Sequence, residues 1–188
     1  EVNRGLTRGE YFWVDIARDG ITLYSLPGSE LATPMPLTAS DAYTMANGYF
    51  VDWSAKVNDA LEIAEFCIEK RKFNDAAFTL HQAAERAYTC FLLVRGQYVP
   101  RSHNLKFLRS LAEDREPRLT QIWPRATKLD RRRFELTKRA YVEARYSVSY
   151  DIGSDDLKAI RAAVTMLRDA VAAVSCEWLD GLRQKADL

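Results

Sequence analysis

Glycine, proline, cysteine and histidine are all scarce in this sequence of 188 residues, and each scarcity excludes a class of protein. The 8 Gly and 6 Pro are too few for a fold built mainly of tight turns and short strands. The three cysteines, Cys67, Cys90 and Cys176, match neither a disulfide framework nor a zinc motif. Two histidines are too few for a histidine-rich metal centre, so we expect His81 to be structural. The composition predicts a protein of a reducing, cytoplasmic compartment with no cofactor in this chain.

Long apolar runs and a strong excess of one charge are absent as well. No stretch of about 18 apolar residues occurs, so the sequence predicts no transmembrane helix and no membrane partner. The first residues lack the basic and apolar pattern of a signal peptide. The net charge is +1, although residues 101–145 hold 13 Lys and Arg against 6 Asp and Glu. That basic segment either meets phosphate or forms a solvated helix face that pairs with the acidic remainder.

Long segments free of glycine and proline predict a mainly α fold. We expect helices over residues 40–72, 74–95, 104–113, 127–147 and 154–184, because apolar residues recur there at helical spacing. Together they predict an up-and-down antiparallel helical bundle of four to five helices. In the last segment, apolar residues alternate at intervals of three and four from Leu157 to Trp178. The segment 74–95 has two apolar stripes, so it should be the most buried helix.

The first 40 residues have a different pattern. Two runs of aromatic and β-branched residues, 11–16 and 21–24, flank Asp19-Gly20, a pair typical of a hairpin turn. The pattern predicts a β-hairpin over residues 11–24, followed by a proline-punctuated linker. An isolated hairpin is unstable, so it either docks on the bundle or is the remnant of a larger sheet, and we expect the second. The sequence therefore divides into residues 1–37 and a bundle over residues 38–188.

Several charged and aromatic residues near the basic segment are candidates for ligand binding. They are Arg101, His103, Arg139, Glu143, Arg145 and Tyr146. Arginine offers phosphate a planar fork, and a helix N-terminus such as the one after His103 favours an anion. The alternative is a structural network in which Arg145 pairs with Glu143 or Glu85 and holds two helices together. No nucleophile elbow or glycine-rich phosphate loop accompanies these residues, so covalent catalysis has no support.

Three segments resemble the HEPN domain family. Residues 73–88 are similar to that family's second helix, residues 100–105 to the following loop and helix start, and residues 140–146 to a later helix. Their order and spacing agree with the family over roughly residues 40–185. The resemblance implies an up-and-down helical bundle and a homodimer. HEPN domains divide into ribonucleases and non-catalytic forms.

The ribonucleases of the family carry an arginine that is followed, four to six residues later, by a histidine. Arg145 matches the arginine, but no histidine lies downstream of it, and Tyr150 stands where the histidine is expected. A phenol with a pKa of about 10 is a poor acid–base group near pH 7. The difference favours a non-catalytic module that binds a nucleotide or RNA and dimerises, over a HEPN ribonuclease.

Residues 1–24 are similar to the end of a polymerase-β-like nucleotidyltransferase, in which Asp15 matches a third metal-binding carboxylate. The two resemblances imply the C-terminal part of a nucleotidyltransferase–HEPN fusion, with Mg²⁺ held only by an intact catalytic domain. The alternative function is nucleotidyl transfer by the intact protein, whose Gly-Ser and Asp-x-Asp motifs would lie upstream of Glu1. Large aromatic residues that suit a homodimer interface are Phe12, Trp13, Tyr24 and Trp178.

Overall fold

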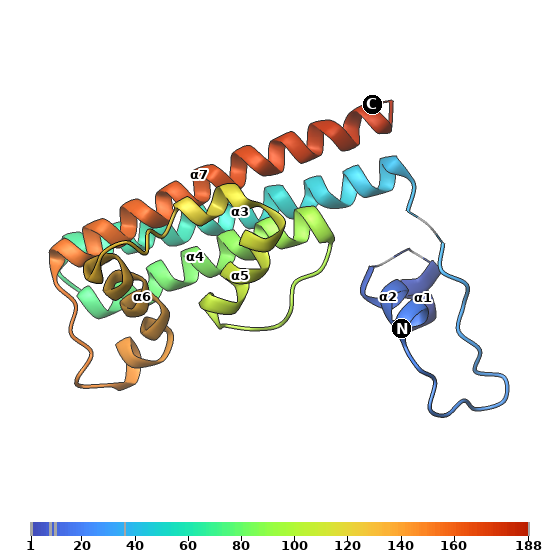
Figure 1. The fold of residues 1–188 in the computed structure, drawn as a ribbon, viewed down its shortest axis with the longest axis horizontal. Coiled ribbons are helices and arrows are strands. Elements are labelled where there is room, and N and C mark those ends of the chain that lie inside the picture. Colours follow the sequence, from blue (N-terminus) through green and yellow to red (C-terminus); the bar gives the residue numbers. More distant parts are fainter. Residues whose placement is uncertain (1, 8, 10, 36, 188) are drawn as a thin grey trace.

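Helices make up the regular structure of the computed structural model, which describes residues 2–7, 9, 11–35 and 37–187. The elements within these ranges are α1 (Val2–Thr7), α2 (Tyr11–Asp19), α3 (Ala39–Glu69), α4 (Phe73–Gly96), α5 (Leu105–Arg115), the 3-10 helix η1 (Pro117–Gln121), α6 (Lys128–Tyr146) and α7 (Ser154–Lys185). The long helices α3, α4 and α7 run alongside one another, and α5 and α6 pack on α4 (Figure 1). The predicted helical bundle is confirmed.

Short sequence features fix where the bundle helices begin. The Thr38 hydroxyl accepts a hydrogen bond from the backbone N–H of Asp41 at the start of α3, at 3.1 Å. At the start of α6, Thr127 and Asp130 exchange hydrogen bonds in a capping box. The side-chain oxygen of Asn104 caps α5 by accepting a hydrogen bond from the backbone N–H of Phe107. Each predicted end of the five bundle helices lies within three residues of the observed end.

Helix α4 forms the centre of the bundle and is the most buried of the described helices, as its two apolar stripes predict. Fourteen of its 24 residues are buried. One stripe carries alanines, which let α3 and α7 approach closely, and Leu80, which is fully buried. The other stripe includes His81 and faces α6. The apolar stripe of α7 is confirmed, since Leu157, Ile160 and Val164 are at most 1% exposed.

The predicted β-hairpin over residues 11–24 is wrong. Residues 11–19 form α2, residues 20–26 have no regular structure, and no strand occurs in the part of the chain that the structure describes. Two features favour the helix over the strand. Arg18 pairs with Asp15 one turn earlier at 2.9 Å, and Trp13 packs directly on the backbone of Gly5 in α1. Gly20 then ends the helix, its N–H donating to the carbonyl of Ile16, rather than forming a hairpin turn.

The aromatic residues that sequence analysis assigned to a homodimer interface lie in different surroundings. Phe12 stacks on Tyr98 of the loop after α4, with ring centroids 5.6 Å apart, which joins α2 to the bundle. Tyr24 is 80% exposed, whereas Trp178 is partly buried and lies beneath the guanidinium of Arg95. Of these residues, Tyr24 is the most available to a partner, and the homodimer stays a prediction. Among the described helices, none is long and apolar enough to cross a bilayer.

Candidate functional site

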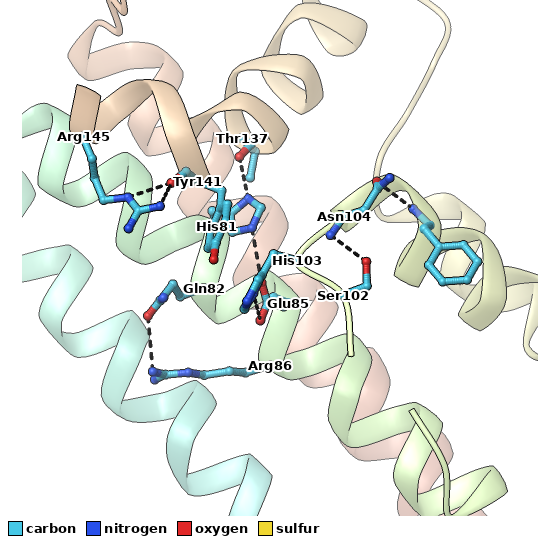
Figure 2. Close-up of polar contacts among 11 residues, drawn as sticks. His81, Gln82, Glu85, Arg86, Ser102, His103, Asn104, Thr137, Tyr141 and Arg145 are labelled. Carbon is cyan, nitrogen blue, oxygen red and sulfur yellow. Dashed lines mark hydrogen bonds and ion pairs between the residues drawn. The ribbon is translucent and has the colours of Figure 1, made fainter. Parts of the chain in front are cut away.

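Four aromatic rings from α4, α6 and the loop before α5 pack together on one side of the bundle. We call them the ring cluster: Phe78, His81, His103 and Tyr141 (Figure 2 labels the last three). His103 stacks on Tyr141 with ring centroids 4.4 Å apart and an interplanar angle of 17°. Tyr141 also contacts His81 at 5.3 Å and Phe78 at 6.3 Å. The second apolar stripe of α4 thus places Phe78 and His81 against α6, which supplies Tyr141.

Glu85 joins the two histidines of the chain. Each of its carboxylate oxygens lies 3.1 Å from Nδ1 of His103, and Oε2 lies 3.4 Å from Nε2 of His81. The buried His81 ring also bonds α6, because its Nδ1 lies 2.9 Å from the carbonyl oxygen of Thr137. A carbonyl only accepts, so Nδ1 of His81 carries the hydrogen and donates it. His81 is therefore structural, as predicted, and it fixes the distance between α4 and α6.

The two histidines also set the ionisation of Glu85. Partial burial acts to raise its pKa, but the neighbouring imidazole rings of His81 and His103 outweigh burial, and the net pKa is lowered. Glu85 therefore stays an anion at neutral pH and anchors the His103 ring in its stacked position. His103 itself remains accessible, since 58% of its side chain is exposed against 19% for Glu85.

Arg145 covers the ring cluster at the end of α6 and makes neither of the ion pairs that sequence analysis considered. Its guanidinium lies over the rings of Phe78, Tyr141 and Tyr146, at 4.6, 4.8 and 4.9 Å from their centroids. The same group donates through Nε and Nη2 to the carbonyl oxygen of Tyr141, one turn back in its own helix (Figure 2). Glu143 and Glu85, its expected partners, bind Arg139 and the two histidines instead.

Arg139 and Glu143 form a separate ion pair and do not join the ring cluster. Their side chains bond twice, with Nε of Arg139 2.7 Å from Oε1 of Glu143. This pairing raises the pKa of Arg139 and lowers that of Glu143. Arg139 and Glu143 each precede a cluster residue of α6, Tyr141 or Arg145, by two positions. Two positions correspond to a rotation of about 200°, so the ion pair lies on the opposite side of the helix from the ring cluster. The six predicted residues therefore make two surfaces.

Two predicted residues remain. Tyr146 is 76% exposed, and the guanidinium of Arg145 connects it to the other rings. Arg101 is exposed and precedes His103 by two residues in the loop before α5. The structure therefore brings Arg145 and Tyr146 to the ring cluster that contains His103, and it places Arg101 in the same loop as His103.

The described residues contain no candidate metal site. No group of three or more His, Cys, Asp or Glu residues is arranged there to hold a metal ion. Asp15, the predicted metal-binding carboxylate, lies in α2 and pairs with Arg18. His103 is hydrogen-bonded to the Glu85 carboxylate, and Nε2 of His81 faces the same carboxylate at 3.4 Å.

Tyr150, which stands where the ribonuclease histidine is expected, points into the core. It is 5% exposed, and its hydroxyl donates to the carbonyl oxygen of Leu136 at 3.0 Å. Burial raises the pKa of Tyr150 to about 12. The hydroxyl is thus neutral at physiological pH, engaged with backbone and remote from solvent, which is unsuited to moving protons during RNA cleavage.

The family model of the HEPN domain matches residues 50–174, which include α4, α5, α6 and most of α3 and α7. The chain belongs to the HEPN domain family. No curated protein matches it. Every residue of the ring cluster falls within the matched range, so the cluster is part of the HEPN domain and not of residues 1–37.

Sequence analysis named the charged members of this HEPN surface and missed the residues that organise it. Tyr141 has the spacing of a core residue, and its role emerges only when α6 is placed against the loop before α5. Glu85 entered as a partner for Arg145, not for two histidines. A clue was present in the spacing of His81 and Glu85, four residues apart on one helix face.

Proposed function

We propose that this HEPN domain is a non-catalytic module that binds a nucleotide or single-stranded RNA at the ring cluster and dimerises. One observation carries the proposal: the His103 ring is stacked on Tyr141, is held by Glu85 and is 58% exposed. A base that stacks on the accessible part of such a ring gains about 1–3 kcal/mol without regard to its identity. The surface is therefore suited to stacking, and we expect it to bind different bases with similar affinity.

Arg145 supplies the charge that a phosphate needs. Its bonds to the Tyr141 carbonyl are weak competitors, because that carbonyl is already positioned to accept the helical hydrogen bond of its own turn. The guanidinium can turn toward an anion while it stays over the rings. Arg101 provides a second cation on the His103 side. A phosphate next to a stacked base would thus be paired by the planar fork of arginine.

Dimerisation is supported by apolar side chains at the end of α6. Val142 is 55% exposed, and Val148 in the following turn is fully exposed. Val142 and Tyr146 lie one turn apart on α6, so they share a helix face, and exposed apolar residues of this kind are ones that partner subunits cover. A homodimer built there would place two ring clusters near one interface.

Two alternatives have less support. The Tyr150 hydroxyl, at the position expected for the ribonuclease histidine, is buried and bonded to backbone, so it does not supply an acid–base group. The strand expected over residues 11–16 is a helix, and nucleotidyl transfer by the intact protein stays a prediction. The proposal therefore concerns the HEPN domain alone.

Binding can be tested with a fluorescein-labelled oligouridylate at low salt, measured by fluorescence anisotropy. We expect Arg145→Ala to weaken binding at least tenfold and His103→Ala to weaken it by a similar factor. The matched control is Arg139→Ala, which removes an arginine from the opposite side of the same helix. It should change the affinity less than twofold, because Arg139 is paired with Glu143.

Competition by unlabelled nucleoside triphosphate separates a mononucleotide site from an RNA site. Absence of RNA binding and of nucleotide binding by the wild-type protein would contradict the proposal. Equal losses in all three variants would also contradict it, because they would indicate general electrostatic attraction. Shortened RNA recovered from the binding reaction would overturn the non-catalytic assignment.

A further inference from the structure

A hollow lies between α3, α4 and α7, away from the ring cluster. Its volume is about 400 Å³. The space exists because small side chains from three helices line it, among them Ser54 of α3, Ala87 of α4 and Ala172 of α7. On α4, Ala87 follows Glu85 by two positions, so the hollow and the ring cluster use opposite sides of that helix. Whatever enters the hollow does not reach the proposed RNA surface.

Apolar groups form the walls of this cavity. Val57, Ala87, Cys90 and Val171 line it and are at most 3% exposed in the folded chain. Phe50 adds a ring from α3. Burial raises the pKa of the Cys90 thiol to about 11, so this thiol is neutral and behaves as an apolar wall group.

A single charged residue, Arg168 of α7, is found among the described residues that line the cavity. Its Nη1 lies 3.5 Å from Oδ1 of Asn58, another lining residue, which places the guanidinium at the α3 side of the opening. Arg168 also pairs with Asp169 at 2.7 Å, but the Asp169 side chain is 62% exposed and does not line the cavity. A surface pair of this type is weak, so the carboxylate of a ligand can replace Asp169.

We propose that this cavity binds an aliphatic monocarboxylate of medium chain length, with its chain between the helices and its carboxylate on Arg168. The size is sufficient, because an apolar cavity of about 150 Å³ holds the six carbons of benzene, so 400 Å³ accommodates a chain of about eight carbons and its carboxylate. The charge fits as well, since one guanidinium forms two parallel hydrogen bonds with one carboxylate. Ser54 and Asn58 can bond the same head group.

Calorimetry on the full chain with octanoate, 1-octanol and octylamine tests this ligand class. We expect octanoate to bind with a stoichiometry of one per chain, 1-octanol to bind at least tenfold more weakly, and octylamine more weakly than 1-octanol. Arg168→Gln should reduce the octanoate affinity about tenfold and leave that of 1-octanol unchanged. The matched control is Arg161→Gln, which lies two turns earlier on α7, pairs with Glu65 and does not line the cavity.

The variant Ala172→Leu tests the location independently, because a leucine at this half-buried position fills the cavity from its rim. It should abolish binding of both octanoate and 1-octanol, with an unchanged helical circular dichroism spectrum. Three results would overturn the proposal: no octanoate binding by the wild-type protein, equal affinity for octanoate and 1-octanol, or undiminished binding by a folded Ala172→Leu variant. The last result would indicate adsorption elsewhere, including at a surface shared with a second copy.

Discussion

Removing the Glu113 carboxylate should destabilise the fold more than removing the Arg109 guanidinium, although the two groups form one ion pair. Their side chains are 9% and 5% exposed, and Nε of Arg109 lies 2.5 Å from Oε1 of Glu113. Glu113 has a second cation, Arg125, at 2.8 Å. Among the described residues, Arg109 has no second anion, and its further contacts are with the carbonyl oxygen of Trp123 at 3.1 Å and the ring of Phe134.

The magnitudes follow from what each substitution leaves behind. Glu113→Leu leaves a buried guanidinium without an anion, which costs about 3–5 kcal/mol. Arg109→Met leaves Glu113 paired with Arg125 and removes one hydrogen bond to a carbonyl, which costs about 1–3 kcal/mol. The double variant buries no unpaired charge, so its loss should be smaller than that of Glu113→Leu alone.

Urea unfolding followed by circular dichroism gives the free energy of unfolding of each variant. The expected coupling energy in this double-mutant cycle is about 2 kcal/mol or more. Additive losses, or a larger loss for Arg109→Met than for Glu113→Leu, would refute the reasoning from burial and second partners.

Three further substitutions test the core position Leu80, the buried hydroxyl of Tyr150 and the ionised carboxylate of Glu85. Leu80→Asp places an unpaired charge at a fully buried position and should cost several kcal/mol, and an unchanged melting temperature would show that α4 is misplaced. Tyr150→Phe should cost about 1 kcal/mol and leave RNA affinity unchanged, which unfolding and anisotropy measure together. The pKa of Glu85 is lowered in the folded state, so its ionised carboxylate stabilises the fold. This stabilisation is fully present above about pH 4.5, the ordinary pKa of glutamate, and is lost as the pH falls through the lower pKa of the folded state. The free energy of unfolding of Glu85→Gln should therefore fall less steeply over this acidic range than that of the wild-type protein, and parallel curves would exclude the assignment.

The bundle could be predicted from sequence because its information is local and periodic. The stripe that begins at Leu157 repeats along α7 without interruption, and one helix pattern explains it. Residues 11–24 carry the same kind of apolar residues, but a segment this short fits a helix and a strand equally well. The helix that forms over residues 11–19 packs Trp13 on Gly5 of α1, a contact that the local sequence pattern does not reveal.

The candidate site was only half predictable for a related reason. His103 and Arg145 attract notice through their chemistry, and each can be named from its neighbours in the chain. The contacts of His81 with Thr137 and of His103 with Tyr141 join residues far apart in sequence, so periodicity cannot reveal them. Which arginine faces the rings, Arg145 or Arg139, depends on how α6 is rotated against α4.

Nuclear magnetic resonance of the two imidazole side chains during an RNA titration tests the central claim most directly. His81 and His103 are the only histidines of the chain, so their ring protons are readily assigned. Stacking of a base on the exposed His103 ring should shift its proton resonances upfield in a saturable manner, while the resonances of the buried His81 change little. Saturable RNA binding that leaves the His103 resonances in place would contradict the account.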